Sequence, residues 1–169
     1  VEKVLKDLGE EGFDYVVCDS PAGIEKGAFL AMYFADRAVV VVNPEVSSVR
    51  DSDRIIGLLD SKTRKAEGGK GGVPASLLLT RYNPARVEAG EMLSITDVEE
   101  VLGLKAIGVI PESGDVLNAS NKGEPVILDP ESIAGKAYDD AVARICGEER
   151  PMRFTTFEKK GFFSKLFGG

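Results

Sequence analysis

Apolar residues along the chain fall into two patterns. Some runs are apolar at every position, which is typical of strands buried on both faces of a parallel sheet. These runs are residues 13–18, 37–42, 75–80 and 105–110. Elsewhere apolar residues recur at helical spacing, which predicts helices at residues 25–34, 48–66 and 96–102, and after Pro130. Strands alternating with helices predict an α/β fold, a parallel sheet with helices on both faces.

Capping signals predict where two of these helices begin. Thr96 and Glu99 have the spacing of a capping box. Asp129 is predicted as an N-cap with Pro130 in the first turn, and Gly147 is placed to end that helix. The composition changes after Gly147, so we expect three parts. They are an α/β body at residues 1–147, a linker at 148–155 and an amphipathic helix at 156–169.

The composition narrows the chemistry. The 169 residues include 28 Asp and Glu against 21 Lys and Arg, for a formal net charge of -7. Histidine is absent, which excludes imidazole bases and Ser-His or Cys-His nucleophile pairs. Cys18 and Cys146 are too few for a disulfide framework or a four-cysteine zinc site, and they fit a reducing compartment. The acidic balance argues against a protein that wraps nucleic acid.

Asp19 follows the apolar run at residues 13–18 and would stand at the carboxyl end of a strand. Ligands of open α/β sheets bind at that edge, where a carboxylate can hold Mg²⁺ beside nucleotide phosphates. Pro21 and Gly23 would then form a loop that responds to the γ-phosphate. The alternative is that Asp19 simply caps a helix. Ser20 stands where some ATPases have a catalytic carboxylate, so we predict no catalytic residue in this chain.

Two other strand ends carry groups that suit a purine. The carboxamide of Asn83 both donates and accepts hydrogen bonds, so it could match the edge of adenine. Pro111 and Glu112 place an apolar ring and exposed backbone at the next strand end. Each motif alone fits the start of a turn better than a site. Their joint presence at one sheet edge favours a nucleotide site.

The glycine-rich stretch at residues 68–72 does not form a phosphate loop. A P-loop needs Gly-Lys-Ser/Thr leading from a strand into a helix. Here Pro74, Ala75 and Ser76 follow, and they lead into a strand. The sequence therefore has a group that can hold a metal but no cradle for phosphates.

The last residues combine phenylalanine with lysine. Wound as a helix, four apolar side chains fall within roughly 140° of one another, and lysines flank that face. This pattern is typical of an interfacial helix that binds anionic membranes weakly and reversibly. The alternatives are a helix that docks on its own domain and a groove-binding peptide. The residues are Phe162, Phe163, Leu166 and Phe167, with Lys159, Lys160 and Lys165.

Several strings together resemble the MinD/ParA family of deviant-Walker-A P-loop ATPases, and within it the septum site-determining proteins. The resemblance covers nearly the whole chain and is weakest at residues 68–74. Its strings are residues 19–25, 43–54, 78–84, 108–112, 123–129, 159–163 and 166–169.

The resemblance implies a cytoplasmic ATPase that lies peripherally on the inner face of the cell membrane and uses ATP and Mg²⁺. With ATP bound, such a protein forms a homodimer, binds the membrane through its C-terminal helix and recruits the division inhibitor MinC. MinE then displaces MinC and stimulates hydrolysis. Nucleic acid is not an expected partner.

The resemblance also implies roles for individual residues. Asp19 matches the Walker B position, where it would contact the metal. The adenine pocket matches Asn83, Pro111 and Glu112, and the surface used by partners of the dimer matches Ser47, Asp51 and Asp53.

The family's Lys-Gly-Gly-x-Gly-Lys-Thr loop and its switch-region Asp are missing from this sequence, which looks like the C-terminal portion of such a protein. We therefore expect the chain alone neither to bind ATP tightly nor to hydrolyse it. A ParA-type DNA-partitioning ATPase is the alternative enzyme, although its DNA surface would be basic. An iron–sulfur relative would need suitably placed cysteines, and we discount it because Cys18 lies inside a predicted strand and Cys146 at a helix end. A non-catalytic, membrane-tethered binding module is the remaining alternative.

Overall fold

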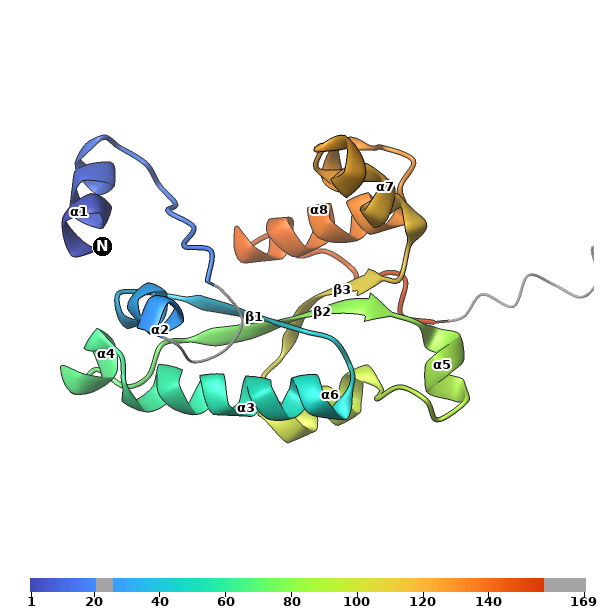
Figure 1. Ribbon diagram of the computed structural model, residues 1–169, viewed down its shortest axis with the longest axis horizontal. Coiled ribbons are helices and arrows are strands. Elements are labelled where there is room, and N and C mark those ends of the chain that lie inside the picture. The colour runs from blue at the N-terminus through green and yellow to red at the C-terminus, as the bar shows by residue number, and fades with distance from the viewer. Residues whose placement is uncertain (21–25, 157–169) are drawn as a thin grey trace, which may run out of the picture.

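Three parallel strands form the centre of the molecule (Figure 1). The computed structural model describes residues 1–20 and 26–156. β1 (Ala38–Val42), β2 (Ala75–Tyr82) and β3 (Ala106–Pro111) lie in that order, and each pairs in parallel with its neighbour. Each agrees within about two residues with one of the four predicted strands, so three of those predictions are confirmed.

Helices cover both faces of this sheet, as predicted. α3 (Val46–Ser61), α4 (Arg64–Glu67) and α6 (Ile95–Leu102) lie on one face, and α7 (Gly114–Lys122) and α8 (Ile133–Ile145) lie on the other (Figure 1). The other elements are α1 (Glu2–Glu10), α2 (Lys26–Tyr33), α5 (Pro84–Glu88) and the 3-10 turn η1 (Val126–Leu128). None of the helices in the described ranges is long and apolar enough to cross a bilayer.

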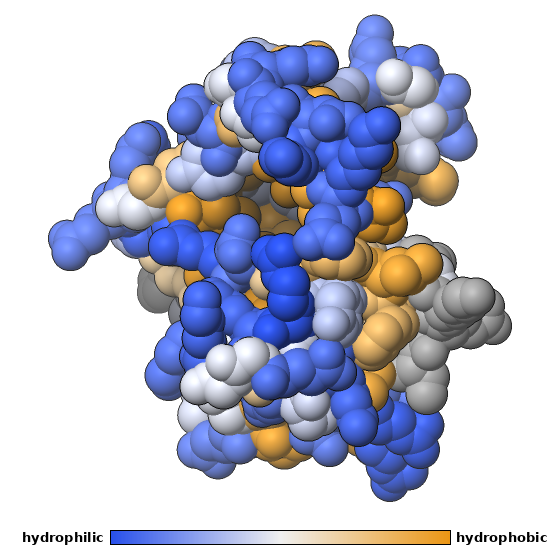
Figure 2. Space-filling model, turned by 90° about the vertical axis from the view of Figure 1, so that its left-hand side faces the viewer, coloured by the Kyte–Doolittle hydropathy of each residue, from blue (hydrophilic) through white to orange (hydrophobic). Residues whose placement is uncertain are grey.

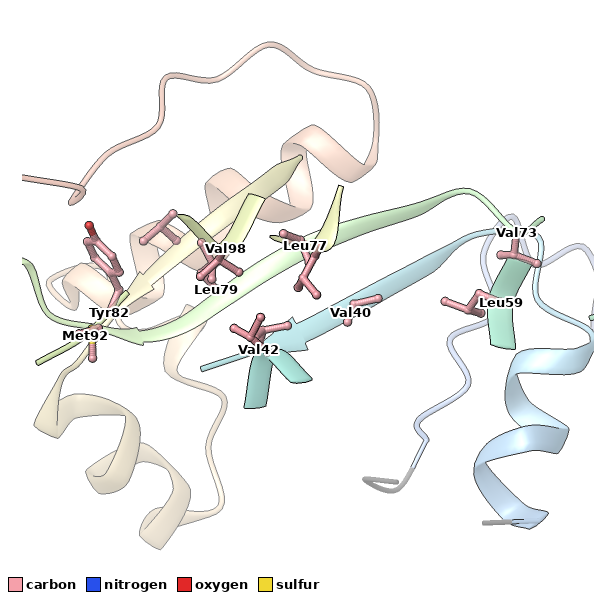
Figure 3. Packing of buried hydrophobic residues seen from close by; sticks show 12 residues of the cluster. Val40, Val42, Leu59, Val73, Leu77, Leu79, Tyr82, Met92 and Val98 are labelled. Atoms are coloured by element: carbon pink, nitrogen blue, oxygen red, sulfur yellow. The ribbon is translucent and has the colours of Figure 1, made fainter. Parts of the chain in front are cut away.

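The main core fills the space between the sheet and the layer of α3 and α6. Val42 of β1 and Leu77 and Leu79 of β2 are fully buried, and Val40 is nearly so. Figure 3 shows these side chains gathered with Val98 of α6. Burial of a side chain of this size contributes about 1.5–3 kcal/mol each. This core therefore holds β1 and β2 in register and fixes where their carboxyl ends lie.

The prediction of a buried strand at residues 13–18 is wrong. Residues 13–20 form no strand, and Val17 is 91% exposed. Apolar character is only half of what a strand needs, because its backbone groups must also find a neighbouring strand. No ladder in the described part of the chain includes these residues.

β1 is buried on one face only, whereas its pattern predicted burial on both. Val39 and Val41 are 42% and 58% exposed and alternate with the buried Val40 and Val42. The reason is that α3 covers one face of β1, while α8 on the other face packs on β3. Figure 2 views the molecule from the left-hand side of Figure 1. It shows apolar side chains exposed at mid-height, between the upper and lower parts of the molecule.

The single helix predicted at residues 48–66 is two helices. α3 ends at Ser61 and α4 begins at Arg64. Thr63 separates them because its Oγ1 donates to the Leu59 carbonyl at 3.2 Å and accepts from the Ala66 N–H at 3.3 Å. Residues 60–65 contain no apolar side chain, so the apolar pattern could not mark this break.

The capping box of α6 lies two residues before the predicted one. Ser94 and Asp97 form it in place of Thr96 and Glu99. The carboxylate of Glu99 instead accepts the backbone N–H of Ala106 at 2.8 Å. Both pairs have the same sequence spacing, so spacing alone did not distinguish them.

The N-cap of α8 is also displaced from the prediction. Ser132 caps the helix by accepting the Gly135 N–H at 3.2 Å. Asp129 accepts the Glu131 N–H at 2.9 Å and so forms a turn around Pro130 rather than a cap. The predicted end is confirmed, because Gly147 follows α8 with a φ of +91°.

Candidate functional site

The carboxyl ends of the three strands bring Asn43, Asn83 and Glu112 to one edge of the sheet. Each of them follows the last residue of its strand. Thr80 Oγ1 donates to Asn43 Oδ1 at 2.9 Å, and the Glu112 N–H donates to the Tyr82 carbonyl at 2.9 Å. The structure therefore places Asn83 beside Glu112 at the edge where open α/β sheets bind ligands.

The carboxamide of Asn83 is held by two sets of hydrogen bonds. Its Oδ1 accepts the N–H groups of Ala85 and Arg86 at 3.1 and 3.4 Å, which caps α5. Its Nδ2 donates to Glu112 Oε2 at 3.1 Å. An asparagine amide has two hydrogens, so within the described residues one is left to donate to a ligand. Because Asn83 Oδ1 already accepts two backbone N–H groups, the acceptor for the exocyclic amine of an adenine would have to be Glu112.

Arg81 belongs to this edge, although the sequence did not indicate it. Its φ of +56° lies in the left-handed region that few non-glycine residues adopt, and the ladder shifts register between Leu79 and Tyr82. Its Nη2 lies 3.9 Å from Glu112 Oε1. Because both side chains are exposed, this pair contributes little to the stability of the fold. Arginine has no preference for positive φ, so the sequence carries no signal for this conformation.

Pro111 does not present its ring at this edge. It is buried as the last residue of β3, paired with Tyr82. Burial raises the pKa of the Tyr82 phenol, and Asp97 adds to the rise, so the phenol stays neutral at physiological pH. The apolar corner lies inside the protein, and Glu112 is the residue that faces solvent.

Asp19 lies outside the sheet. It is exposed at the end of residues 13–20, which pair with no strand in the described part of the chain. Within the described ranges, no group of three or more His, Cys, Asp or Glu residues could hold a metal. A single carboxylate still suits Mg²⁺, which takes one or two carboxylates together with phosphate and water oxygens. Pro21 and Gly23, the predicted switch loop, lie outside the described residues.

The predicted partner residues lie at the exposed start of α3. Ser47, Asp51 and Asp53 are all exposed. Ser47 and Asp51 are one turn apart and share a face, whereas Asp53 lies about 200° around the helix from Asp51. Asp51 also lies 3.7 Å from the guanidinium of Arg54. The structure therefore brings two of the three residues onto one surface.

The glycine-rich stretch at residues 68–72 connects α4 to β2, as expected of a surface loop. Gly72 passes so close to Asp60 that a Cβ at Gly72 would overlap Asp60 Oδ1 and lie 2.8 Å from Asp60 Cα. The loop leads into a strand and not into a helix, so it lacks the helix N-terminus that holds phosphate in a P-loop. The predicted membrane residues, from Lys159 to Phe167, lie outside the described residues.

Comparison with curated proteins finds close relatives, whereas no protein-family model matches. The chain is 62% identical over 169 residues to the septum site-determining protein MinD of Escherichia coli (strain K12). The alignment covers 100% of this chain and 63% of that protein. The chain therefore spans less than two thirds of the length of this curated relative.

Solved structures agree with the fold. The MinC:MinD cell division protein complex of Aquifex aeolicus matches with a TM-score of 0.79 and 39% identity, over 90% of this chain and 60% of that one. The cell division ATPase MinD of Pyrococcus furiosus matches with a TM-score of 0.70 and 26% identity, over 85% and 55%. MinD of Pyrococcus horikoshii, solved with Mg-ADP, has a TM-score of 0.70 over 85% and 54%. At 23% identity, this last match concerns the fold alone.

Proposed function

Over the part of those proteins that it spans, the chain belongs to the MinD family, and we propose that it acts as an ATP-dependent, membrane-associated regulator of division-site placement. The observation that carries the proposal is the alignment with the Escherichia coli relative, at 62% identity over all 169 residues. This alignment spans both the C-terminal segment and the edge formed by Asn43, Asn83 and Glu112, which we call the strand-end edge. Because the chain covers 63% of that relative, the activity and partners of the whole protein are part of the proposal.

ATP with Mg²⁺ is the proposed ligand. Adenine would lie at the strand-end edge, with Nδ2 of Asn83 donating to a ring nitrogen and Glu112 accepting from the exocyclic amine. Pro111, as the buried last residue of β3, would position Glu112 at this edge rather than contact adenine with its own ring. Asp19 would supply the carboxylate for Mg²⁺, whose role is to neutralise charge on the phosphates. The bond between Asn83 and Glu112 supports this arrangement, because it holds both groups in place.

The 169 residues alone should neither bind ATP tightly nor hydrolyse it. The sequence contains no Gly-x-x-x-x-Gly-Lys-Ser/Thr loop, so the phosphates would have neither a backbone cradle nor its lysine. Turnover of Mg-ATP by the purified chain would contradict this expectation.

MinC and MinE are the proposed partners, and an ATP-dependent homodimer is the proposed binding form. The Aquifex aeolicus complex supports MinC, because it contains a MinD protein of the same fold bound to MinC. The surfaces we propose for these partners lie at the exposed start of α3, with Ser47 and Asp51 on one face of the helix and Asp53 on another.

Attachment to the membrane is proposed through the C-terminal segment. Its four apolar side chains and three lysines suit an anionic surface. This attachment would place the protein peripherally on the inner face of the cell membrane. The division of the chain after residue 147 into a linker at 148–155 and an amphipathic helix at 156–169 is part of the same proposal.

A chimera in Escherichia coli cells that lack their own MinD tests the function. The part of the Escherichia coli relative that this chain does not cover is placed before the 169 residues. We expect the chimera to restore septa at mid-cell and Asp51→Ala/Asp53→Ala to abolish the rescue. The control Glu10→Ala/Glu11→Ala, at the carboxyl end of α1, should keep it. A chimera that is expressed and membrane-bound but leaves septa misplaced would refute the proposal.

A further inference from the structure

The segment after α8 runs back along that helix and is tied to it by Arg144. The Arg144 guanidinium donates to the carbonyl oxygens of Arg150 at 3.0 Å and Pro151 at 2.5 Å. It also donates to the Ile107 carbonyl of β3 at 2.7 Å. A single side chain therefore joins the segment, the helix and the sheet. We call residues 148–154 the strap.

An ion pair further along the strap adds to this attachment. Arg153 Nε and Nη2 donate to the two carboxylate oxygens of Asp140 at 2.6 and 2.8 Å, and Nη2 also donates to the Lys136 carbonyl at 3.3 Å. Asp140 is only 3% exposed. A two-point bond of this kind fixes both position and orientation.

Phe154 holds the end of the strap on the α8 side of the sheet. It packs on the small core formed by Ile110 and Ala134, together with Val116 of α7 and Val126 of η1. Its φ of +62° is unusual for a bulky residue and is maintained by these contacts. The strap therefore ends against a core to which α7 and η1 also contribute.

The surface at this point is both apolar and acidic. Four large apolar side chains are 39–72% exposed on α7, η1 and α8, and η1 contacts both of these helices. Residues 112–131 hold five Asp and Glu against one Lys. We call this surface the α7–η1 face. Its residues are Leu117, Ile127, Leu128 and Ile133, with the exposed carboxylates of Glu124 and Glu131.

We propose that residues 157–169 dock on the α7–η1 face of their own chain when no membrane is present. Their phenylalanines and leucine match its apolar side chains, and their lysines match its carboxylates. Thirteen residues span about 20 Å as a helix and roughly 45 Å when extended, which sets the reach of the segment. The strap anchors the segment to the same chain as the face, which raises the effective concentration of the segment there.

Docking would compete with membrane binding, because the same side chains face either the protein or the lipid. This second step rests on the proposed attachment to the membrane, whereas the docking itself does not. The body would then lower the affinity of its own tail for lipid until a membrane of sufficient charge displaces it.

Paramagnetic relaxation in the full chain tests docking without lipid. A spin label is attached to Ser164→Cys in a Cys18→Ser/Cys146→Ser background. We expect it to broaden the amide signals of residues 114–133 selectively, and a label at Ser61→Cys to leave them sharp. Absence of selective broadening overturns the proposal. Spin-labelled protein without isotopes is also mixed with isotope-enriched protein that carries no label. If the broadening arises only between these two molecules, the segment docks on a second copy and the proposal is overturned.

Leu117→Ser/Leu128→Ser should abolish the broadening while the rest of the spectrum keeps its dispersion. Val46→Ser/Val101→Ser is the matched control, because those side chains are 59% and 62% exposed on the opposite face of the sheet. Equal loss of broadening in both double variants would overturn the assignment of the α7–η1 face.

Binding to phosphatidylglycerol-containing vesicles tests the competition separately. Glu124→Lys/Glu131→Lys should raise vesicle affinity about 5–10-fold above Glu88→Lys/Glu100→Lys, which changes the net charge equally on α5 and α6. Equal affinities would refute competition. If no variant binds vesicles, the proposed membrane attachment fails, while the relaxation result still decides docking.

Discussion

Glu99 connects the end of α6 to the start of β3 through its carboxylate. Oε1 accepts the Ala106 N–H at 2.8 Å, and Oε2 accepts from Lys105 Nζ at 2.9 Å. The backbone bond from Ala106 is the main reason that the pKa of Glu99 lies below its ordinary value, and Lys105 lowers it further. A depressed pKa means that the folded state favours the charged carboxylate, so this contact stabilises the fold in a pH-dependent way.

Glu99→Gln should therefore cost more stability at neutral pH than in acid. The contribution of the wild-type carboxylate is complete above the unfolded pKa of about 4.3 and is lost as the pH falls through the lower folded-state pKa. We expect the difference in unfolding free energy between wild type and variant to be constant from about pH 7 to 5 and to shrink below about pH 4. Urea denaturation across this range measures it, with Glu100→Gln as the control. A stability difference between wild type and Glu99→Gln that does not change with pH would contradict the conclusion that the charged carboxylate of Glu99 stabilises the fold.

Among the described residues, Asp140 forms an ion pair with Arg153 alone. Its side chain is 5% exposed, and Arg153 binds both of its oxygens, which raises the pKa of that guanidinium. Arg153→Met should lower the free energy of unfolding by about 2–3 kcal/mol, because a buried carboxylate loses its partner. Asp140→Asn/Arg153→Met should recover much of the loss. Arg150→Met removes an exposed pair with Glu148 and should cost less than about 0.5 kcal/mol in the same urea titration. Equal losses of unfolding free energy for Arg153→Met and Arg150→Met would show that the burial of Asp140 does not strengthen its dependence on Arg153.

At the scale of elements, the apolar pattern predicted strands but not their neighbours. The runs at residues 13–18 and 37–42 look alike, yet only the second finds a partner, because β2 supplies its ladder. Helix positions also followed from periodicity, whereas their ends did not. Ends depend on one side-chain oxygen, such as that of Thr63 or Ser94, and several residues nearby could have served equally well in the sequence.

The strand-end edge was predictable for a topological reason. Parallel strands bring their carboxyl ends to one edge, so Asn83 and Glu112 had to lie near each other once their strands were assigned. Arg81 and the buried ring of Pro111 were not predictable. A positive φ and a burial fraction arise from the packing of neighbouring chain segments, which no local pattern records.

The packing of α8 on β3 depends on a glycine. A Cβ at Gly108 would lie 2.6 Å from Ala141 Cβ and 2.7 Å from Leu78 Cδ1. Gly108→Ala should therefore cost about 1–3 kcal/mol, because helix and sheet must move apart. Gly114→Ala on α7 is the control, since nothing lies within 4 Å of its Cβ position. Thermal unfolding of the two variants measures the difference, and a Gly108→Ala protein as stable as wild type would show that the layers can shift freely.

At the scale of the whole molecule, charge is divided between body and tail. The formal net charge of -7 divides into -10 over residues 1–152 and +3 from Arg153 onward. An acidic body is repelled by both DNA and anionic lipid. Only the tail combines positive charge with large apolar side chains, and DNA offers no apolar phase for those side chains to enter. The division therefore favours a membrane over nucleic acid as the charged partner.

Co-sedimentation with vesicles and with DNA at two salt concentrations separates these partners. We expect the chain to bind vesicles that contain anionic lipid, to bind them less at high salt, and to bind neither zwitterionic vesicles nor DNA. Each lysine near an anionic surface contributes about 1 kcal/mol, so Lys159→Gln/Lys160→Gln/Lys165→Gln should weaken vesicle binding by roughly 100-fold. Lys62→Gln/Lys65→Gln/Lys70→Gln, which removes the same charge from the body, should weaken it far less. DNA binding that falls steeply with salt and survives deletion of residues 157–169 would instead favour a DNA-partitioning protein.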